Sequence, residues 1–425
     1  MPGVVSNLLK DVPIPKFVKI KQVFPRPKIE RSDIPKVIND LISPAKFSDR
    51  IKPGMRVCIT AGSRGVANVD IITKSIVDFC KSKGAEPFVI PAMGSHGGAT
   101  AEGQLEILAS YNITEETMGC PIVSCMDTVE IGVTEEGHHV RIDKNAAGAD
   151  AIIVSCRIKP HTGFRGPYES GIMKMMTIGM GKQAGAEVCH EAGFKHMARL
   201  VPMFGRVIRD NAPVIFAVAT IENAFDETAK LVALTPDEFD EMEPKYLKEA
   251  FANMPRIMFD ECDVLVVDEI GKNISGDGMD PNISGTFCTP YASGGIKSQR
   301  VAVLGLTEET HGNGIGMGMA SAISKRVWDQ VDLQKGYPNA ITSTVLVCAA
   351  VPPIMDNDKE AIQICIRTAN EIDKNNPRIV RIPNTLHIEH IMISEAMLDE
   401  ARKNPNIVIE SEPFELPFNE EGNLW

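Results

Sequence analysis

The chain lacks any apolar run of the length that a membrane segment needs. In its 425 residues, no stretch approaches the roughly 18 consecutive apolar residues of a spanning helix. The N-terminal segment has no continuous apolar core either, because Pro13, Pro15 and several lysines interrupt it. We therefore expect no signal peptide and no membrane partner, and the sequence predicts a cytoplasmic protein.

Positive charge is also scarce. Lys and Arg number 44 against 56 Asp and Glu, which gives a formal net charge of −12. Nucleic acids and anionic membranes are bound through a basic footprint, so we expect neither as a partner. An acidic protein must hold an anionic substrate with a few local Arg, Lys or backbone N–H groups, because its overall field does not attract one.

The common metal and dinucleotide signatures are missing. The ten cysteines include no C-x-x-C pair, which is typical of reduced cytosolic thiols rather than a disulfide framework. There is no H-E-x-x-H and no EF-hand pattern, which argues against a conventional zinc or calcium site. No G-x-G-x-x-G turn joins a strand to a helix, and the alternating glycines of 312–321 favour close backbone packing over an anion loop.

Short β-branched runs alternate with helix-like segments along most of the chain. Continuous runs of this kind are typical of strands buried on both faces of a parallel sheet. Residues 121–143 alternate in polarity instead and predict an antiparallel hairpin at a sheet edge. Strands are expected at 55–60, 86–92, 149–158, 212–222, 263–271, 298–306 and 343–351, and helices at 68–84, 100–110 and 321–331.

The pattern predicts an α/β protein with two domains and largely parallel sheets. We place the domains at residues 1–258 and 259–425, with the active site in the cleft between them. The C-terminal tail is free to pack back on the first domain. The first 50 or so residues carry many Pro and Lys and are expected to wrap the surface before the first core strand.

Two of the expected strands are followed by loops that suit ligand binding. His96 stands among Gly94, Gly97 and Gly98, where the backbone can approach a ligand and a helix start can hold an anion. His96 is then a candidate general acid and base, although a tight turn with a solvated histidine fits the same pattern. The Ser63–Arg64 pair after the first strand could bind a phosphate, or be an ordinary surface pair.

The loop after the third strand brings Lys159, His161 and Arg165 within seven residues. Such a loop could present an imidazole and a guanidinium to a carboxylate. The alternative is a polar loop with a proline turn.

An amine and a third histidine follow in a Gly- and Met-rich stretch, sixteen residues apart. Lys174 has apolar neighbours, which favour the neutral amine that a nucleophile needs, although it could also be a lysine that extends out of a buried helix. His190, next to Cys189, could ligate a soft or borderline metal, or be structural.

Taken together, the segments 91–104, 159–166 and 169–183 resemble the lactate racemase family, in a branch distinct from lactate racemase itself. The resemblance runs from about residue 55 to the end of the chain. It implies a nickel-pincer nucleotide, a pyridinium mononucleotide whose thioamide and thiocarboxylate groups hold nickel. Two features depart from the family pattern: Ala61 stands where an Asp is usual, and the loop from His161 to Lys174 is longer.

The resemblance also implies roles for individual residues. Lys174 would carry the cofactor covalently, and His190 would complete the nickel coordination. His96 and His161 would act as acid and base on the two hands of the substrate, and Arg64 would lie near the cofactor phosphate. Further candidates are Ser63, Gly94, Gly97 and Gly98 for the cofactor, and Lys159, Arg165 and Lys272 for the substrate.

The implied reaction is racemisation or 2-epimerisation of an α-hydroxy acid, by transient hydride transfer through a 2-keto acid. The polar loops and the longer segment after His161 favour a larger acid, such as an aldonate. Implied partners are the small acid and the proteins that synthesise the cofactor, while the oligomeric state is open, a homo-oligomer included. There are two alternatives to this hypothesis: a nicotinamide-dependent hydroxy-acid dehydrogenase, and a non-catalytic protein that binds nickel or a nucleotide.

Overall fold

The computed structural model describes residues 3–63 and 65–425. It divides into two compact units. The N-terminal unit is Pro25–Met254, and the C-terminal unit consists of the residues up to Phe24 together with Pro255–Trp425. We expected the first 24 residues to belong to the N-terminal domain. They join the C-terminal unit because β1 (Phe17–Gln22) pairs with strands near the end of the chain, and Phe17 is fully buried there.

The N-terminal unit is built on one sheet in the order β3-β2-β6-β7-β8. The pairs from β3 to β7 are parallel, and β8 runs antiparallel to β7. This confirms the α/β class. The strands are β2 (Arg56–Ala61), β3 (Glu86–Pro91), β6 (Ala151–Arg157), β7 (Val214–Glu222) and β8 (Thr228–Leu234).

Helices cover both faces of this sheet because successive residues of each strand point in opposite directions. Val57, Ile59 and Ile153 pack towards α2 and α4, whereas Cys58 and Ile152 pack towards α8, α9, α10 and α11. The helices are α2 (Ile34–Ile42), α3 (Ala45–Ser48), α4 (Val69–Ser82), α5 (Ala101–Ser110), α6 (Glu115–Met118), α7 (Lys144–Ala147), α8 (Ile172–Lys174), α9 (Lys182–Glu191), α10 (Phe194–Asn211) and α11 (Phe239–Asn253), with a π-turn at Met175–Gly179 and 3₁₀ turns at Arg31–Asp33, Gly97–Ala99 and Pro236–Glu238.

The predicted hairpin is present as β4 (Thr128–Val133) and β5 (His139–Asp143). It forms a separate two-stranded sheet rather than an edge of the main one. The expectation that the first 50 residues only wrap the surface was wrong. Ile34, Ile38 and Ile42 of α2 are fully buried, because their spacing lines one face of that helix.

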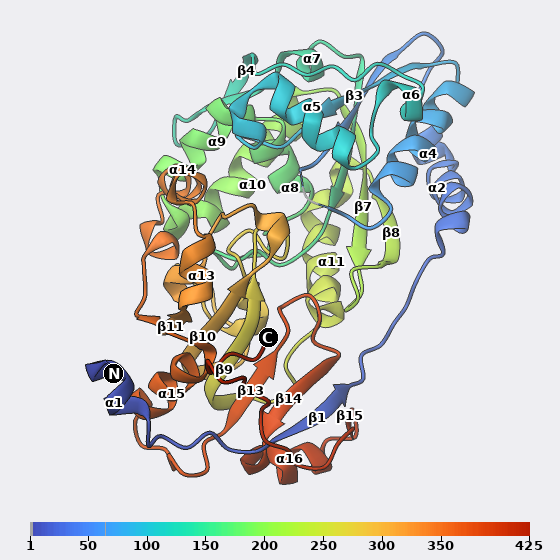
Figure 1. Ribbon diagram of the computed structural model, residues 1–425. Helices are drawn as coiled ribbons and strands as arrows, with labels where there is room; N and C mark the ends of the chain where they lie inside the picture. Colours follow the sequence, from blue (N-terminus) through green and yellow to red (C-terminus); the bar gives the residue numbers. More distant parts are fainter. Residues whose placement is uncertain (1–2, 64) are drawn as a thin grey trace. The chain divides into compact units, whose positions relative to one another are not determined.

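The C-terminal unit has its own mixed sheet, in the order β12-β11-β10-β9-β13-β14-β1-β15. It is parallel from β12 to β13 and antiparallel beyond, and Figure 1 shows the blue β1 between the red β14 and β15. Its other strands are β9 (Glu261–Ile270), β10 (Lys297–Leu306), β11 (Ala322–Ser324), β12 (Ile354–Met355), β13 (Ile379–Ile382), β14 (His390–Ser394) and β15 (Ile407–Ile409). Its helices are α1 (Val4–Leu9), α12 (Pro281–Ser284), α13 (Lys325–Gln330), α14 (Leu333–Ser343), α15 (Asp358–Thr368) and α16 (Leu398–Lys403), with 3₁₀ turns at Glu308–Thr310, Met317–Met319, Leu346–Ala349 and Glu395–Met397. The C-terminal tail packs within this unit, where the backbone of Phe414 pairs with that of Phe17.

Two sequence predictions fail in the C-terminal unit. The expected strand at 343–351 is instead the end of α14 followed by a 3₁₀ turn. Thr344 has a φ of +61°, which an extended strand does not allow, and Leu346 is 66% exposed. The helix expected from 321 begins only at Lys325, because Ile323 is fully buried as a strand residue that pairs with β10 and β12.

Candidate active site

Three loops with predicted site residues leave the carboxyl ends of neighbouring parallel strands. Ser63 follows β2, His96 follows β3 and His161 follows β6. The chain passes from β2 outward to β3 and then returns to β6 on the other side of β2, so the strand order reverses between β2 and β6. Open α/β sheets bind their ligands beyond the carboxyl ends of the strands at such a reversal. This edge of the sheet is therefore where a ligand is expected.

The loop after β3 is packed against the segment that follows Lys174. The N–H of Gly94 donates to the carbonyl of Gly179 at 3.2 Å. Gly97 has a φ of +67°, and a Cβ there would lie 2.6 Å from the backbone of Gly103. These glycines thus let the loop pack closely against its neighbours. Contact with a cofactor remains a prediction for Gly94, Gly97 and Gly98.

His96 is exposed on this loop, and its Nδ1 forms a hydrogen bond with Oγ of Ser63. The carbonyl of Ser63 accepts a hydrogen bond from the hydroxyl of Tyr111 at 2.9 Å, which fixes the serine. A hydroxyl can donate or accept, so His96 can carry its proton on either ring nitrogen. This arrangement suits an imidazole that exchanges a proton. Arg64, predicted near the cofactor phosphate, lies outside the described residues.

The loop after β6 is closed at its base and organised around a buried carboxylate. The backbones of Lys159 and Ser170 exchange two hydrogen bonds, of 2.9 and 3.1 Å. Inside the loop, Glu169 is 2% exposed and accepts the N–H groups of His161 at 2.7 Å and Gly166 at 3.1 Å. Burial raises the pKa of Glu169 above its ordinary value. The carboxylate thereby holds the backbone of His161 in one position.

The ring of His161 has a different partner from the ring of His96. The N–H of Gly163 donates to Nδ1 of His161 at 2.9 Å. A backbone N–H can only donate, so Nδ1 must lack a proton and the neutral ring carries its proton on Nε2. His161 is therefore held as a donor through Nε2.

The loop also carries two cationic residues, Lys159 and Arg165. Arg165 turns back onto its own loop, where Nη1 donates to the carbonyl of His161 at 2.6 Å and approaches Glu169 at 3.3 Å. Lys159 contributes its backbone to the base of the loop. Substrate binding by either side chain remains a prediction.

Lys174 ends the short helix α8, which runs directly into the π-turn. The helix is anchored at its start by Glu243, whose Oε2 accepts the N–H of Met173 at 3.1 Å. Glu243 is 1% exposed, and burial raises its pKa to about 8. π-turns occur frequently at functional sites, and this one begins at the residue after Lys174.

His190 lies on α9, and its environment places it near Lys174. Burial, with the charge of Lys174 as a second cause, lowers the pKa of His190 to about 4. Phe194 connects it to the other loop, since the ring centroids of His190 and His161 lie 6.2 and 6.1 Å from that of Phe194. The amine and two of the three predicted histidines thus belong to one cluster.

The chemistry of His190 fits a metal ligand. Its Nδ1 is buried and has no hydrogen-bond partner among the described residues. A neutral imidazole with an unused lone pair is the state that binds a metal ion. The described part of the chain contains no cluster of three or more His, Cys, Asp or Glu side chains placed to hold a metal. A metal at His190 would therefore need its other ligands from a bound organic group.

Comparison with known proteins adds a family to this geometry. Residues 6–200 match the model of the lactate racemase N-terminal domain. The matched segment, 195 of the 425 residues, identifies a lactate racemase N-terminal domain in this chain. All four of Lys174, His190, His96 and His161 fall within the matched residues. No curated protein was found to match in sequence.

The fold of the chain is similar to that of a solved structure. The structure of the lactate racemase apoprotein from Thermoanaerobacterium thermosaccharolyticum matches with a TM-score of 0.54 at 15% sequence identity. The match covers 87% of this chain and 94% of the other. At this identity the likeness establishes the fold, an α/β protein with two mainly parallel mixed sheets. Among the described residues, no helix is both long and apolar enough to cross a bilayer.

Lys272, the remaining substrate candidate, belongs to the C-terminal unit. It follows β9, where its Nζ donates to the carbonyl of Gly276 at 2.7 Å and its N–H donates to Oγ1 of Thr310 at 2.9 Å. The glycines of 312–321 are confirmed as close packing. A Cβ at Gly316 or Gly318 would collide with neighbouring carbonyl oxygens.

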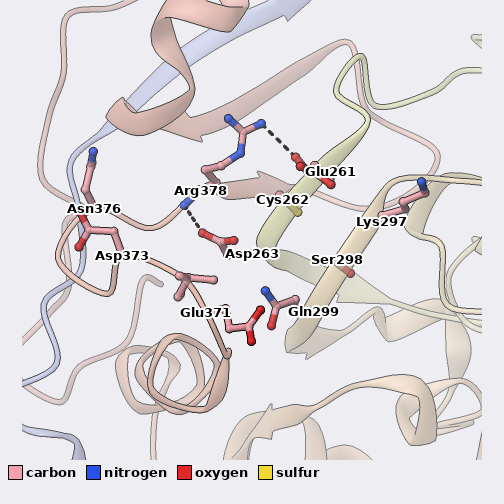
Figure 2. Close-up of a pocket in the computed structure, with 11 residues that line it drawn as sticks. Glu261, Cys262, Asp263, Lys297, Ser298, Gln299, Glu371, Asp373, Asn376 and Arg378 are labelled. Carbon is pink, nitrogen blue, oxygen red and sulfur yellow. Dashed lines mark hydrogen bonds between the residues drawn. The ribbon is translucent and has the colours of Figure 1, made fainter.

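A pocket of about 500 Å³ also lies in the C-terminal unit (Figure 2). It sits at the amino ends of β9, β10 and β13, beside Glu261, Lys297 and Arg378. The backbone N–H of Arg378 donates to Asp263 at 2.8 Å, so part of its charged lining is already engaged. Ligands of open α/β sheets bind at the opposite, carboxyl ends of the strands. We therefore assign this pocket no part in the reaction.

Sequence reasoning missed the buried polar residues that hold the candidate site. Glu169 and Glu243 gave no signal, because a single carboxylate in a loop or helix is ordinarily solvated. Gln104 and Lys182 stood inside the segments that carry the family resemblance, but nothing in the sequence indicated that they are buried together. Their contacts lie beneath the His96 loop.

Proposed function

We propose that the protein racemises, or epimerises at carbon 2, an α-hydroxy acid, with a nickel-pincer nucleotide held by Lys174 and His190. The observation that carries the proposal is His190, a neutral imidazole with a buried and unbonded Nδ1 beside the charge of Lys174. The match of residues 6–200 to the lactate racemase N-terminal domain supports the same chemistry.

When bound, the cofactor would supply an electrophilic centre that takes hydride from Cα and returns it. Loss of Cα–H as a proton is unfavourable, because the carboxylate beside it is already negative. Removal of hydride together with the hydroxyl proton yields a planar 2-keto acid, and return of hydride and proton to the opposite face inverts the centre. The protein then has to move one proton and hold one carboxylate.

His96 and His161 are the groups that we propose for the proton. His96 can accept a hydroxyl proton, because Ser63 can reverse its hydrogen bond as the ring changes state. His161 at rest offers Nε2–H to a substrate oxygen, because Gly163 occupies its Nδ1. For His161 to act as a base, its proton must move to Nδ1, which breaks the bond from Gly163. The two histidines would thus begin their proton transfers from different resting tautomers: His96 is ready to accept a proton, whereas His161 is ready to donate one.

The substrate carboxylate needs a cation. We propose Lys159, Arg165 or Lys272 for this role, and Arg165 would have to exchange its contacts to the carbonyl of His161 and to Glu169 for it. The polar loop between His161 and Lys174 leads us to propose a hydroxylated acid such as an aldonate. The protein would act in the cytoplasm and depend on the proteins that synthesise the cofactor.

The test uses protein produced with the cofactor-synthesis proteins and a panel of chiral α-hydroxy acids deuterated at carbon 2. We expect inversion with deuterium retained in the product, since hydride transfer does not exchange with water. Lys174→Ala should abolish inversion, and Lys195→Ala, which removes an exposed lysine of α10, should leave it unchanged. Deuterium lost to solvent would indicate proton abstraction. Net formation of keto acid would indicate a dehydrogenase, and nickel binding without inversion of any acid would indicate a binding protein.

A further inference from the structure

A buried ion pair lies beneath the His96 loop. Lys182 and Asp143 are both fully buried, and Nζ and Oδ2 are 3.2 Å apart. Lys182 has a φ of +54°, a left-handed conformation that is uncommon for a residue other than glycine. The other oxygen of Asp143 accepts the N–H groups of Asn145 and Ala146 at the start of α7, so the carboxylate is fully engaged.

The ammonium of Lys182 reaches the His96 loop through one glutamine. Nζ donates to the carbonyl of Pro91 at 2.5 Å and to Oε1 of Gln104 at 3.0 Å. Gln104 is fully buried, and its Nε2 donates to the carbonyls of Gly94 at 2.9 Å and His96 at 3.2 Å. Every donor of the ammonium and both donors of the amide are thus used.

These contacts fix the His96 loop as well as the end of β3. The amide of Gln104 cannot rotate, because Lys182 holds its oxygen on one side and two carbonyls hold its nitrogen on the other. The same loop is tied to the π-turn after Lys174 by the bond from Gly94 to Gly179. The buried ammonium of Lys182 therefore helps to fix both the backbone of His96 and the segment that follows Lys174.

Stability alone does not explain this cluster. A buried ion pair can often be replaced by apolar side chains without loss of stability, because the desolvation of two charges offsets their attraction. Geometry is what the cluster supplies. It sets the direction of two adjacent carbonyls in a loop whose glycines would otherwise allow several conformations.

We propose that Gln104, held by Lys182 and Asp143, is a positioning residue that aligns His96 for proton transfer. The proposal rests on the proposed function, since it concerns the acid and base of that reaction. Gln104 touches neither substrate nor cofactor in this account and acts through the backbone of His96. A displacement on the order of 1 Å in a reacting group can reduce a rate about a hundredfold.

The test variant is Gln104→Met, which has a similar length and leaves the ion pair and the contact to Pro91 intact. Lys182→Met is less suitable, because it leaves Asp143 buried without its cation and can unfold the unit. The matched control is Gln363→Met in the C-terminal unit, where Gln363 is also buried and donates to the carbonyl of Val12 at 2.7 Å. Both variants lose a buried amide that serves a backbone carbonyl.

The first readout is hydrogen–deuterium exchange of peptides that cover residues 92–104, in protein without cofactor. We expect faster exchange in Gln104→Met than in the wild type, and unchanged exchange there in Gln363→Met. The second readout is turnover of the loaded protein. We expect kcat to fall about a hundredfold in Gln104→Met, with KM and nickel content close to those of the wild type.

Unchanged exchange at 92–104, or faster exchange with unchanged kcat, would overturn the proposal. A rise in KM with kcat retained would also overturn it, because that result assigns Gln104 to substrate binding. Failure of the proposed function would look different, because the wild type itself would then show neither nickel loading nor inversion.

Discussion

The loops that carry His96 and His161 are anchored in opposite ways. The His96 loop presents carbonyls to a buried cation, through Gln104 and Lys182. The His161 loop presents N–H groups to a buried anion, Glu169. Each anchor matches the backbone groups that its loop leaves without partners, since a buried polar group without a hydrogen bond is unfavourable. The pair shows how one sheet edge can hold two imidazoles with unrelated sequence motifs.

The difference extends to the rings themselves. His96 has a hydroxyl as its Nδ1 partner, and His161 has a backbone N–H. A hydroxyl adapts to either protonation state, whereas an N–H permits only one. The resting site is therefore asymmetric, although the proposed reaction needs both histidines.

Among changes to these two loops, the largest expected effect comes from removing either imidazole. His96→Ala and His161→Ala should each lower the rate of inversion by about 10²–10⁴-fold, the usual contribution of a general acid or base. Nickel content, measured by metal analysis, should remain at the wild-type level in both. Loss of nickel in His161→Ala would show that this loop holds the cofactor rather than the proton.

Breaking the cationic anchor should cost stability. Lys182→Met leaves Asp143 buried without its cation and should lower the free energy of unfolding by about 3–5 kcal/mol, measured by chemical denaturation. The double variant Lys182→Met/Asp143→Asn removes both charges and keeps an oxygen for the start of α7. It should recover much of the loss. A double variant as unstable as the single one would show that the ion pair is not the source of the effect.

The anionic anchor should respond to pH. Burial raises the pKa of Glu169 in the folded protein, so the folded state keeps a proton that the unfolded state releases. Stability from this group is present below its unfolded pKa, near 4.3, and is lost as pH rises through the raised value. The melting temperature of Glu169→Gln relative to the wild type should therefore be lowest near pH 4 and improve towards pH 7. If the melting temperature of Glu169→Gln instead fell further below that of the wild type as the pH rose, the raised pKa of Glu169 would be contradicted.

The smallest effect is spectroscopic and separates the two rings directly. In protein labelled with ¹⁵N-histidine, we expect His161 to show the Nε2–H tautomer, with Nδ1 unprotonated. His96 should show a mixture of tautomers or a shift between them in Ser63→Ala. If His161 carried its proton on Nδ1, the proposed difference between the two histidine rings would be contradicted.

The sequence predicts the strands of the parallel sheets well, because burial on both faces leaves continuous β-branched runs such as 151–157 and 214–222. The same rule failed at 343–351, where the apolar run lies partly on the surface. β1 was not predicted, since its partners β14 and β15 lie about 370 to 390 residues further along the chain and its lysines interrupt the apolar pattern.

The candidate site was predictable in part. The family motifs located Lys174 and His190 in one segment, and the structure brings them within electrostatic reach of each other. The residues that hold the loops could not be predicted, because Gln104, Lys182 and Glu169 have unremarkable neighbours in sequence. Their burial arises from tertiary packing, which a single sequence does not display.

The most direct test of the central claim is an intact-mass spectrum with nickel analysis, on protein produced with the cofactor-synthesis proteins. We predict a nickel-containing adduct that maps to Lys174, is absent from Lys174→Ala and persists in Lys195→Ala. His190→Ala should keep the organic adduct and lose most of the nickel. Protein that carries neither adduct nor nickel, under conditions that load a known lactate racemase, would contradict the account.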